Sequence, residues 1–214
     1  MSIKKSVLIT SVFSAAFSMN ELAIANTGSF ASAFSVNENA GFVIGAQGGY
    51  ANEHWDNLAP SSSSVNDTGF AARGYIGYDV NQFFGFESGY TYLPKTTVDG
   101  QSGNVKNYAI DLLAKLSIPV SSVLNIYAKA GEGYLNSRFS GGGAGYANDQ
   151  TNTHIGPVFG VGAAYEIIPN LAIDVSWMRY SGQGNIANGS DFEYQPSPDA
   201  LLLGVSYKFP VRYS

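Results

Sequence analysis

Residues 108–118, with the sequence YAIDLLAKLSI, can form either a helix or a strand, and the choice between the two constrains the fold more than any other feature. A helix would place Asp111 and Lys115 four residues apart as a surface ion pair. A strand instead puts both charges on one face and a continuous apolar run on the other. Seven other segments alternate in the same manner, which favours the strand.

The repeated alternation predicts eight strands, each about the length that crosses a bilayer when tilted. Tight turns are expected near Asn81, Pro119 and Asn170, whereas long polar connections cover residues 52–67, 136–152 and 181–199. Short turns at one end and long loops at the other are typical of bacterial outer-membrane barrels. We therefore predict an all-β, eight-stranded antiparallel up-and-down transmembrane β-barrel. Its strands are expected at residues 41–51, 70–80, 83–93, 108–118, 124–134, 155–165, 171–180 and 200–209.

A soluble eight-stranded barrel of the lipocalin kind is the alternative, and the two faces of the strands distinguish it. A soluble barrel directs its apolar face inward and its charges toward water. Here the charged face also carries most of the strand glycines, which indicates a crowded interior, and the opposite face is apolar with Trp177 and tyrosines near the strand ends. This favours lipid outside. Glu132 and Arg179 fall on the outward phase beside long loops, where a charge at the membrane interface costs little free energy. A bulge could also turn Glu132 inward.

The N-terminus has the pattern of a secretory signal peptide. Lys4 and Lys5 precede an uncharged run over residues 6–19, and Ala23-Ile24-Ala25 forms a small-x-small cleavage pattern; cleavage after Ala33 is the alternative. We expect a signal peptide over residues 1–25, an N-terminal extension over 26–40, the barrel over 41–209 and a short tail over 210–214. No other segment has the roughly 18 apolar residues of a membrane helix.

Four stretches resemble the transmembrane domain of the outer membrane protein A (OmpA) family in order and spacing. They are GYDVNQFFGFESGYTYL (77–93), LLAKLSIPVSSVLNIYAKAG (112–131), GPVFGVGAAYEIIPNLAI (156–173) and LLLGVSYKF (201–209). The resemblance covers about residues 41–209 and implies a barrel in a Gram-negative outer membrane, surrounded by lipid and lipopolysaccharide. It also implies periplasmic chaperones and the barrel-assembly machinery as partners, the latter reading alternate residues of the last strand, here Leu203, Val205, Tyr207 and Phe209.

The chain departs from the family pattern in two ways. Long family members continue into a periplasmic domain that grips peptidoglycan, whereas this sequence stops at Ser214, so cell-wall tethering is not expected. The family's lumenal charges are also only partly matched. Glu87 and Lys115 fall on matching positions and Lys129 replaces an arginine, but Ala164 and Asp174 stand where the family commonly has a glutamate and an arginine.

The inward phase of the predicted strands carries four acidic and four basic residues: Arg73, Asp79, Glu87, Asp111, Lys115, Lys129, Asp174 and Lys208. An unpaired charge in such a space would be costly, so the balance of signs suggests mutual pairing. One interpretation is that these charges plug the lumen. The other is a narrow ion-conducting pore with constrictions formed by Glu87 with Lys115 and by Asp174 with Lys129.

Other function classes find less support in the sequence. The formal charge of −5 and the lack of a basic stripe argue against nucleic acid. His54 and His154 are expected at the loop end, but two loop histidines do not make a catalytic site, and we expect no enzyme activity, cofactor or metal. The loops offer aromatic contact residues for adhesion or for a host-cell or phage ligand, and we expect a monomer. These aromatic residues are Trp55, Phe139, Tyr146, Phe192 and Tyr194.

Overall fold

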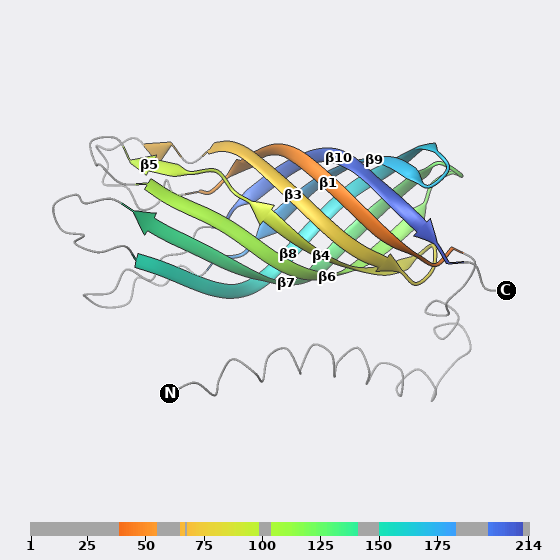
Figure 1. Ribbon diagram of the computed structural model, residues 1–214, viewed down its shortest axis with the longest axis horizontal. Coiled ribbons are helices and arrows are strands. Elements are labelled where there is room, and N and C mark those ends of the chain that lie inside the picture. Colours follow the sequence, from red (N-terminus) through yellow and green to blue (C-terminus); the bar gives the residue numbers. More distant parts are fainter. Residues whose placement is uncertain are drawn as a thin grey trace, which may run out of the picture.

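The computed structural model describes residues 39–54, 65–66, 68–98, 104–140, 150–182 and 197–211. All regular structure in these ranges is β-strand (Figure 1). The strands are β1 (Gly41–Asn52), β2 (Val65–Asn66), β3 (Thr68–Asp79), β4 (Phe84–Tyr92), β5 (Thr96–Val98), β6 (Asn104–Pro119), β7 (Leu124–Ser140), β8 (Gln150–Ile168), β9 (Leu171–Tyr180) and β10 (Asp199–Pro210). No helix within these ranges is long and apolar enough to cross a membrane.

Eight long strands close into an antiparallel barrel. Each long strand pairs with its neighbour along the chain, β6 pairs with β7, and β1 pairs with both β3 and β10, which closes the sheet. The short strands β2 and β5 extend the wall at the loop end. Residues 108–118 lie within β6, so the strand prediction for this segment is confirmed, and the predicted eight-stranded barrel is confirmed with it.

The three tight turns lie at one end of the barrel, and side chains satisfy their backbone groups. In the first, the Asn81 Oδ1 atom accepts hydrogen bonds from the backbone N–H groups of Phe83 and Phe84. In the second, the Ser121 Oγ atom accepts from the N–H of Leu124 at 3.1 Å. In the third, Asn170 takes a φ of 69°, which asparagine tolerates better than most residues. These are the local signals that made the turns predictable.

One predicted loop is shorter than expected. Residues 136–152 were expected to form a loop, but β7 runs to Ser140 and β8 begins at Gln150, with Phe139 paired to Gln150. Beyond the membrane-length segment, the sequence of these strands no longer alternates strictly between apolar and polar residues. Their backbones nevertheless continue to pair as far as Phe139 and Gln150. Phe139, which was expected to be a loop contact residue, therefore lies in a strand.

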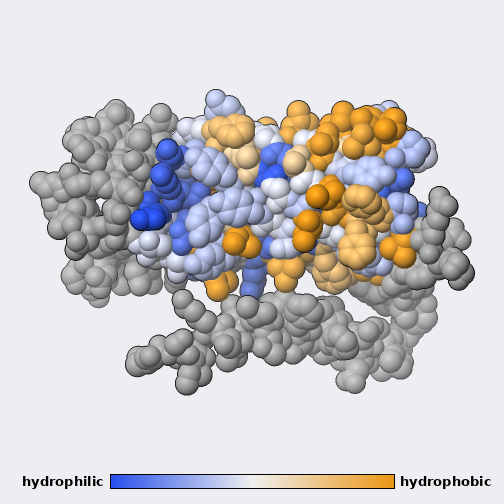
Figure 2. All heavy atoms as spheres, viewed as in Figure 1, coloured by the Kyte–Doolittle hydropathy of each residue, from blue (hydrophilic) through white to orange (hydrophobic). Residues whose placement is uncertain are grey.

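The outer face of the barrel is a band of large apolar side chains. Phe42, Ile76 and Leu203 are each at least 60% exposed, and many more outward residues resemble them. Figure 2 shows hydrophobic residues covering much of the wall, with hydrophilic residues gathered toward the loop end. Soluble proteins rarely expose so large an apolar surface, and its position matches the lipid-facing side predicted from the alternation. The register is continuous at Glu132, which faces outward opposite Leu112 and Pro157, so no bulge turns it inward.

Candidate functional site: the barrel lumen

The inward-facing side chains form three levels between the turn end and the loop end of the barrel. We call them the vestibule, lined by Asp79, Lys115 and Lys208 together with the turns; the charge network, built around Arg73 and Glu87; and the apolar layer, the buried cluster near the loop end. The strands cross the membrane at a tilt, so each level receives side chains from several strands. The three levels differ in chemistry.

The vestibule is a cavity of about 470 Å³. Asn81, Ser121 and Asn170, from the three tight turns, contribute to its lining, so it opens at the turn end. Asp79 lies between two lysines, with its Oδ1 atom 2.6 Å from Lys115 Nζ and its Oδ2 atom 3.1 Å from Lys208 Nζ. These side chains are 14–27% exposed, so water reaches this pairing.

Arg73 is the centre of the charge network, and its side chain is fully buried. The guanidinium binds both carboxylate oxygens of Asp111, with Nη2 at 2.8 Å from Oδ1 and Nη1 in contact with Oδ2. Nη2 also donates to Glu87 Oε1 at 3.0 Å, and Nη1 donates to the hydroxyls of Thr91 and Tyr180. This two-pronged contact with a carboxylate is the geometry that the planar guanidinium favours.

Lys129 extends the network from the other side of Glu87. Its Nζ atom lies 2.9 Å from Oε1 and 2.8 Å from Oε2 of Glu87, and it also lies over the rings of Tyr75 and Tyr127, 5.0 Å and 4.6 Å from their centroids. Glu87 therefore meets two buried cations, Arg73 and Lys129. Burying these charges is tolerable because each has a partner of opposite sign within hydrogen-bond distance.

Asp174 is held differently from the other buried carboxylates. Within the described residues, its contacts are hydrogen bonds from uncharged groups: Gln47 Nε2 and Tyr127 OH, both at 2.6 Å, and Tyr75 OH at 3.4 Å. Gln47 also donates to Ser176, so this side chain on β1 contacts two inward residues of β9. The cluster thus adds polar contacts that fill the lumen beside the ion pairs.

Inner-face glycines make room for these large side chains. A Cβ atom on Gly89 would overlap the guanidinium of Arg73, one on Gly45 would overlap the ring of Tyr75, and one on Gly162 would overlap the hydroxyl of Tyr127. The concentration of glycine on the charged face therefore reflects a filled interior, as the sequence indicated.

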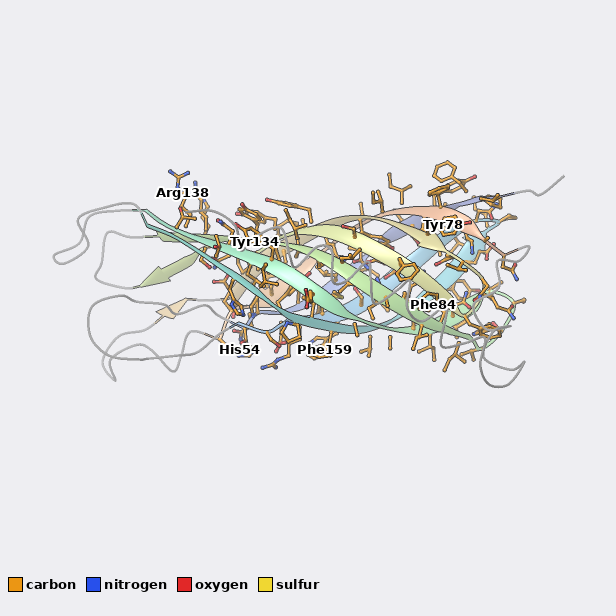
Figure 3. The ribbon with its side chains drawn as sticks, turned by 90° about the horizontal axis from the view of Figure 1, so that it is seen from below. His54, Tyr78, Phe84, Tyr134, Arg138 and Phe159 are labelled. Atoms are coloured by element: carbon orange, nitrogen blue, oxygen red, sulfur yellow. The ribbon has the colours of Figure 1, made fainter. Side chains whose placement is uncertain are left out.

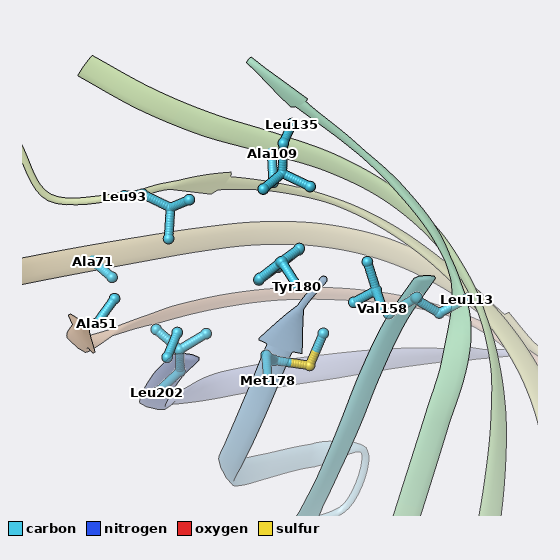
Figure 4. Close-up of a cluster of buried hydrophobic side chains, with 11 residues drawn as sticks. Ala51, Ala71, Leu93, Ala109, Leu113, Leu135, Val158, Met178, Tyr180 and Leu202 are labelled. Atoms are coloured by element: carbon cyan, nitrogen blue, oxygen red, sulfur yellow. The ribbon is translucent and has the colours of Figure 1, made fainter. Parts of the chain in front are cut away.

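Most of the apolar layer lies on the loop side of the charge network, whereas Leu113 lies opposite Glu87, at the level of the network itself. Its members come from seven of the eight long strands and the end of β4, and each is at most 2% exposed (Figure 4). Tyr180 joins the two levels, because its ring lies in the layer while its hydroxyl contacts Arg73, Thr91 and Asp111. The layer consists of Ala51, Ala71, Leu93, Ala109, Leu113, Leu135, Val158, Met178, Tyr180, Ala200 and Leu202.

All eight charged residues predicted for the lumen lie on the inner face, in the vestibule or beside Arg73 and Asp174. The predicted constriction pairs are wrong, however. Glu87 pairs with Arg73 and Lys129, not with Lys115, because the β4–β6 register places Gly85 opposite Lys115 and Glu87 opposite Leu113. The ion pair of Lys129 is likewise with Glu87 and not with Asp174.

Several lumenal residues were missed by the sequence analysis. Tyr180 continues the inward phase of Asp174 and Ser176 and could have been found by extending that alternation by two steps on β9. Glu53 lies just beyond β1, is fully buried and accepts a hydrogen bond from Asn107, a contact that no local sequence pattern signals. The apolar layer was missed because apolar residues were assigned to lipid alone.

The loop candidates are only partly covered by the structure. Trp55, Tyr146, Phe192 and Tyr194 lie outside the described residues, as does the predicted signal peptide. His54 lies at the loop-end rim, with its Nε2 atom 2.8 Å from Asp199 Oδ2, and His154 lies on β8 (Figure 3). The described residues contain no cluster of His, Cys, Asp or Glu that could hold a metal ion. Leu203, Val205, Tyr207 and Phe209 all face outward on β10.

Two curated proteins are similar over most of the chain. Outer membrane protein A of Shigella flexneri is 28% identical over 193 residues, which cover 88% of this chain and 54% of that protein. An uncharacterized protein of Coxiella burnetii is also 28% identical and covers 96% of this chain and 99% of its own length. The chain thus spans about half the length of the outer membrane protein A relatives.

Solved structures agree on the fold. Neisserial surface protein A superimposes with a TM-score of 0.59 at 24% identity, covering 80% of this chain and all of that one. The outer membrane protein OprG of Pseudomonas aeruginosa gives a TM-score of 0.56 at 15% identity, covering 83% and 100%. A family model described as the OmpA-like transmembrane domain matches residues 37–212. The chain therefore belongs to the OmpA-like transmembrane domain family, as an eight-stranded β-barrel of the Gram-negative outer membrane.

Proposed function

We propose that this protein is a closed structural barrel that anchors surface-exposed loops in the outer membrane and does not conduct ions at rest. The observation that carries the proposal is the apolar layer, whose members are at most 2% exposed. All of its members except Leu113, which lies level with Glu87, are taken to lie between the buried charge network and the loop end, so the lumen has a polar seal and a second, apolar seal in series.

The two seals oppose ion passage for different reasons. In the charge network, each of the four buried charges around Arg73 already has an opposite partner, so an entering ion would have to displace one of them. In the apolar layer, an ion would lose its hydration without gaining a polar partner, which is the more costly step. The vestibule is therefore a blind cavity and not half of a channel.

A narrow ion-conducting pore is the second candidate, and the vestibule favours it. The cavity has a volume of about 470 Å³ and is lined by both signs of charge. Conduction would require side chains of the network and of the apolar layer to move together, since neither level alone leaves a path. The alternative therefore predicts openings that are rare and sensitive to lumenal charge.

Planar-bilayer recordings distinguish the two candidates. We expect no sustained unitary openings from the purified protein, and none from Lys115→Ala, because this lysine lies in the vestibule and outside both seals. Flotation of the same proteoliposomes and a heat-modifiable gel band verify that folded protein is present. Sustained openings whose conductance changes in Lys115→Ala would overturn the proposal and establish the pore.

The surface role is a further part of the proposal. It is supported by the asymmetry of the barrel, with tight turns at one end and long connections at the other, where bacterial barrels place their extracellular loops. Because β7 and β8 extend further than expected, residues 141–149 are the segment to delete, and residues 183–196 are the second. If the loops bind a host-cell or phage ligand, one of these deletions abolishes attachment while the heat-modifiable band remains; attachment that persists in both refutes this role.

We also propose that β10 carries the signal read by the barrel-assembly machinery. Four outward residues alternate along it to a terminal aromatic, and Tyr207 and Phe209 contact each other edge to face at 4.7 Å. Phe209→Ala is expected to lower the amount of assembled protein in cells but not the folding of purified protein into vesicles. Equal assembly of the variant and the wild-type chain would refute the proposed signal.

A further inference from the structure

Two outward-facing charges of opposite sign, Glu132 and Arg179, lie on the strands on either side of β8. Glu132 on β7 is exposed, and its sheet neighbours are Leu112 on β6 and Pro157 on β8. Within the described residues, Glu132 forms no hydrogen bond and no ion pair. Arg179 on β9 has Asp199 as a carboxylate partner at 3.3 Å, and its side chain is 46% exposed.

The sheet register gives the heights of these residues on the barrel. Following the paired residues once round the sheet from Gly41 on β1 leads back to β1 at Ala51, ten residues nearer the loop end. With a rise of ~3.3 Å per residue and ~4.8 Å between strands, this stagger corresponds to a strand tilt of ~40°. Each step to the next strand along a paired residue therefore climbs ~3 Å toward the loop end, and each residue along a strand counts for ~2.5 Å.

These heights place Glu132 and Arg179 level with each other, inside the apolar band. Arg179 pairs with Phe159 on β8, whereas Pro157, the partner of Glu132, lies two residues nearer the loop end. This difference offsets the climb over two strands, so the two charges lie within ~2 Å of the same height. Tyr134 lies two residues beyond Glu132, ~5 Å nearer the loop end, where an aromatic belt residue is expected. Glu132 therefore faces hydrocarbon.

A carboxylate that faces hydrocarbon is unfavourable unless it acquires a partner. Its hydration is already lost when the barrel inserts, so an opposite charge brought to it within the membrane is a net gain. Arg179 can supply that charge, because a guanidinium has several N–H donors and the contact with Asp199 uses only Nη1. In the lumen, Arg73 likewise binds two carboxylates at once. Within one chain, however, β8 separates Glu132 from Arg179.

A two-fold axis along the membrane normal, placed against β8, brings the two charges together. All copies insert with their loops on the same side of the membrane, so this is the axis that a symmetric pair of chains can share. Half a turn about it sets β7 of one copy against β9 of the other and leaves the heights unchanged. Glu132 of each copy then faces Arg179 of the other, and one interface contains two ion pairs.

The sizes of the neighbouring side chains fit the same arrangement. Below Glu132, the outward face of β7 carries the small residues Ala130 and Ala128, whereas Trp177 lies two residues below Arg179 on β9. The two-fold axis therefore packs the indole of each copy over the alanines of the other. Phe159 is 50% exposed on β8 and meets its own counterpart at the axis. Close packing and polar pairs of this kind drive association in lipid, where the hydrophobic effect gives no driving force.

We propose that a second copy of this chain covers β7, β8 and β9, in a two-fold symmetric dimer held by reciprocal Glu132–Arg179 ion pairs. This replaces the expectation of a monomer. The interface provides Glu132 with the opposite charge that its own chain does not bring to it, and it removes Phe159 and Trp177 from lipid. The lumen and the loop end stay outside the contact, so each barrel keeps its own surface loops.

Single cysteines test the geometry, because the chain contains no cysteine of its own. Phe159→Cys, at the axis, is expected to give a cross-linked dimer with a short bis-maleimide when the protein is folded into phosphatidylcholine vesicles. Each chain then has one thiol, so a cross-link joins two copies. The matched control is Ala72→Cys on β3, which lies four strands from β8 in either direction and is expected to stay monomeric.

Sedimentation equilibrium in detergent micelles tests the ion pairs. Glu132→Gln removes both pairs of the interface and is expected to raise the dimer dissociation constant at least about tenfold. Arg179→Gln is expected to give a similar rise, and adding it to Glu132→Gln no further one, because both act through the same contact. Lys106→Gln, which removes an exposed charge of β6 beyond the apolar band, is the control and should leave the constant unchanged.

The proposal is overturned if Phe159→Cys does not cross-link, since β8 would then face lipid or a different protein. Equal cross-linking of Ala72→Cys would show random collision instead of a defined interface. An unchanged dissociation constant in Glu132→Gln would show that the ion pairs do not hold the copies together, and an equal rise in Lys106→Gln would show an effect of overall charge. A heat-modifiable gel band verifies folding, and Val161→Cys, also on β8, replaces Phe159→Cys if that variant does not fold.

Discussion

Replacing Arg73 by methionine tests the energetic role of the charge network. The substitution keeps most of the side-chain volume but removes the guanidinium, so Asp111 loses both of its charged contacts. Among the side chains of the described residues, it keeps only the hydroxyl of Tyr180, 3.2 Å from Oδ2. Glu87 still has Lys129. Removing one partner of a buried ion pair costs about 3–5 kcal/mol, because the remaining charge stays buried without compensation. We expect Arg73→Met to destabilise the barrel by this amount.

The matched control is Lys115→Met in the vestibule. Lys115 is also paired with a carboxylate, but its side chain is 17% exposed, and Asp79 keeps Lys208 as a partner. We expect a loss below ~1 kcal/mol, as for other water-accessible pairs. A second variant, Arg73→Met/Asp111→Leu, removes both charges and is expected to recover most of the lost stability, since replacing a whole buried pair by apolar residues is often nearly neutral.

Equilibrium unfolding in urea measures these differences. The protein is folded into phosphatidylcholine vesicles, and the transition is followed by the tryptophan fluorescence of a Trp55→Phe background, in which Trp177, which faces the lipid, is the reporter. The reasoning fails if Arg73→Met costs no more than Lys115→Met. It also fails if the double variant is as unstable as Arg73→Met, because the loss of stability would then come from packing and not from the buried carboxylate of Asp111 that is left without a charged partner.

Two further predictions concern the inner and outer faces of the wall. Gly89→Ala is expected to destabilise the barrel by about 1–3 kcal/mol, because its Cβ atom would overlap the Arg73 guanidinium. Gly74→Ala is the control and should be nearly neutral, because no atom lies within 4 Å of the added Cβ. Equal urea midpoints for the two variants would contradict the crowded interior. Leu112→Arg, near the middle of the lipid-facing band, is expected to cost about 2–4 kcal/mol, against about 0–1 kcal/mol for Ile118→Arg at the turn-end edge. A similar loss in both arginine variants would refute the assigned membrane position.

The fold was predictable from the sequence because lipid and lumen impose opposite chemistry on alternate residues. The segment from Tyr108 to Ile118 is ambiguous alone, but its phase agrees with seven others and with turns signalled by Asn81 and Asn170. The membrane also fixes strand length, so eight similar segments with short and long connections leave few other architectures. The extension of β7 and β8 was not predictable, because beyond the membrane neither face has a fixed chemistry.

The lumenal contacts were less predictable, since alternation gives the face of a residue but not its height. Neighbouring strands in a barrel are staggered, and the β4–β6 stagger sets Lys115 two residues from the level of Glu87, toward the turn end. Lys115 therefore meets Asp79, which comes from β3. The apolar layer was not predicted because alternation gives no signal where both faces of a strand are apolar. Leu113 and Leu202 lie on the inward phase, but their sequence neighbours on the outward phase are leucine or alanine.

The central claim, that a dry apolar layer closes the lumen, is tested most directly at Met178. The sequence has three methionines, Met1, Met19 and Met178, so the chain processed after residue 25 or 33 would keep Met178 alone. Methyl-¹³C labelling of methionine and alanine then gives one methionine signal, from within the layer, and the assigned methyl of Ala172, which lines the vestibule, serves as the water-exposed reference. The account predicts magnetisation transfer from water to Ala172 and none to Met178. Transfer of equal strength to both methyl groups would show a water-filled lumen and would contradict it.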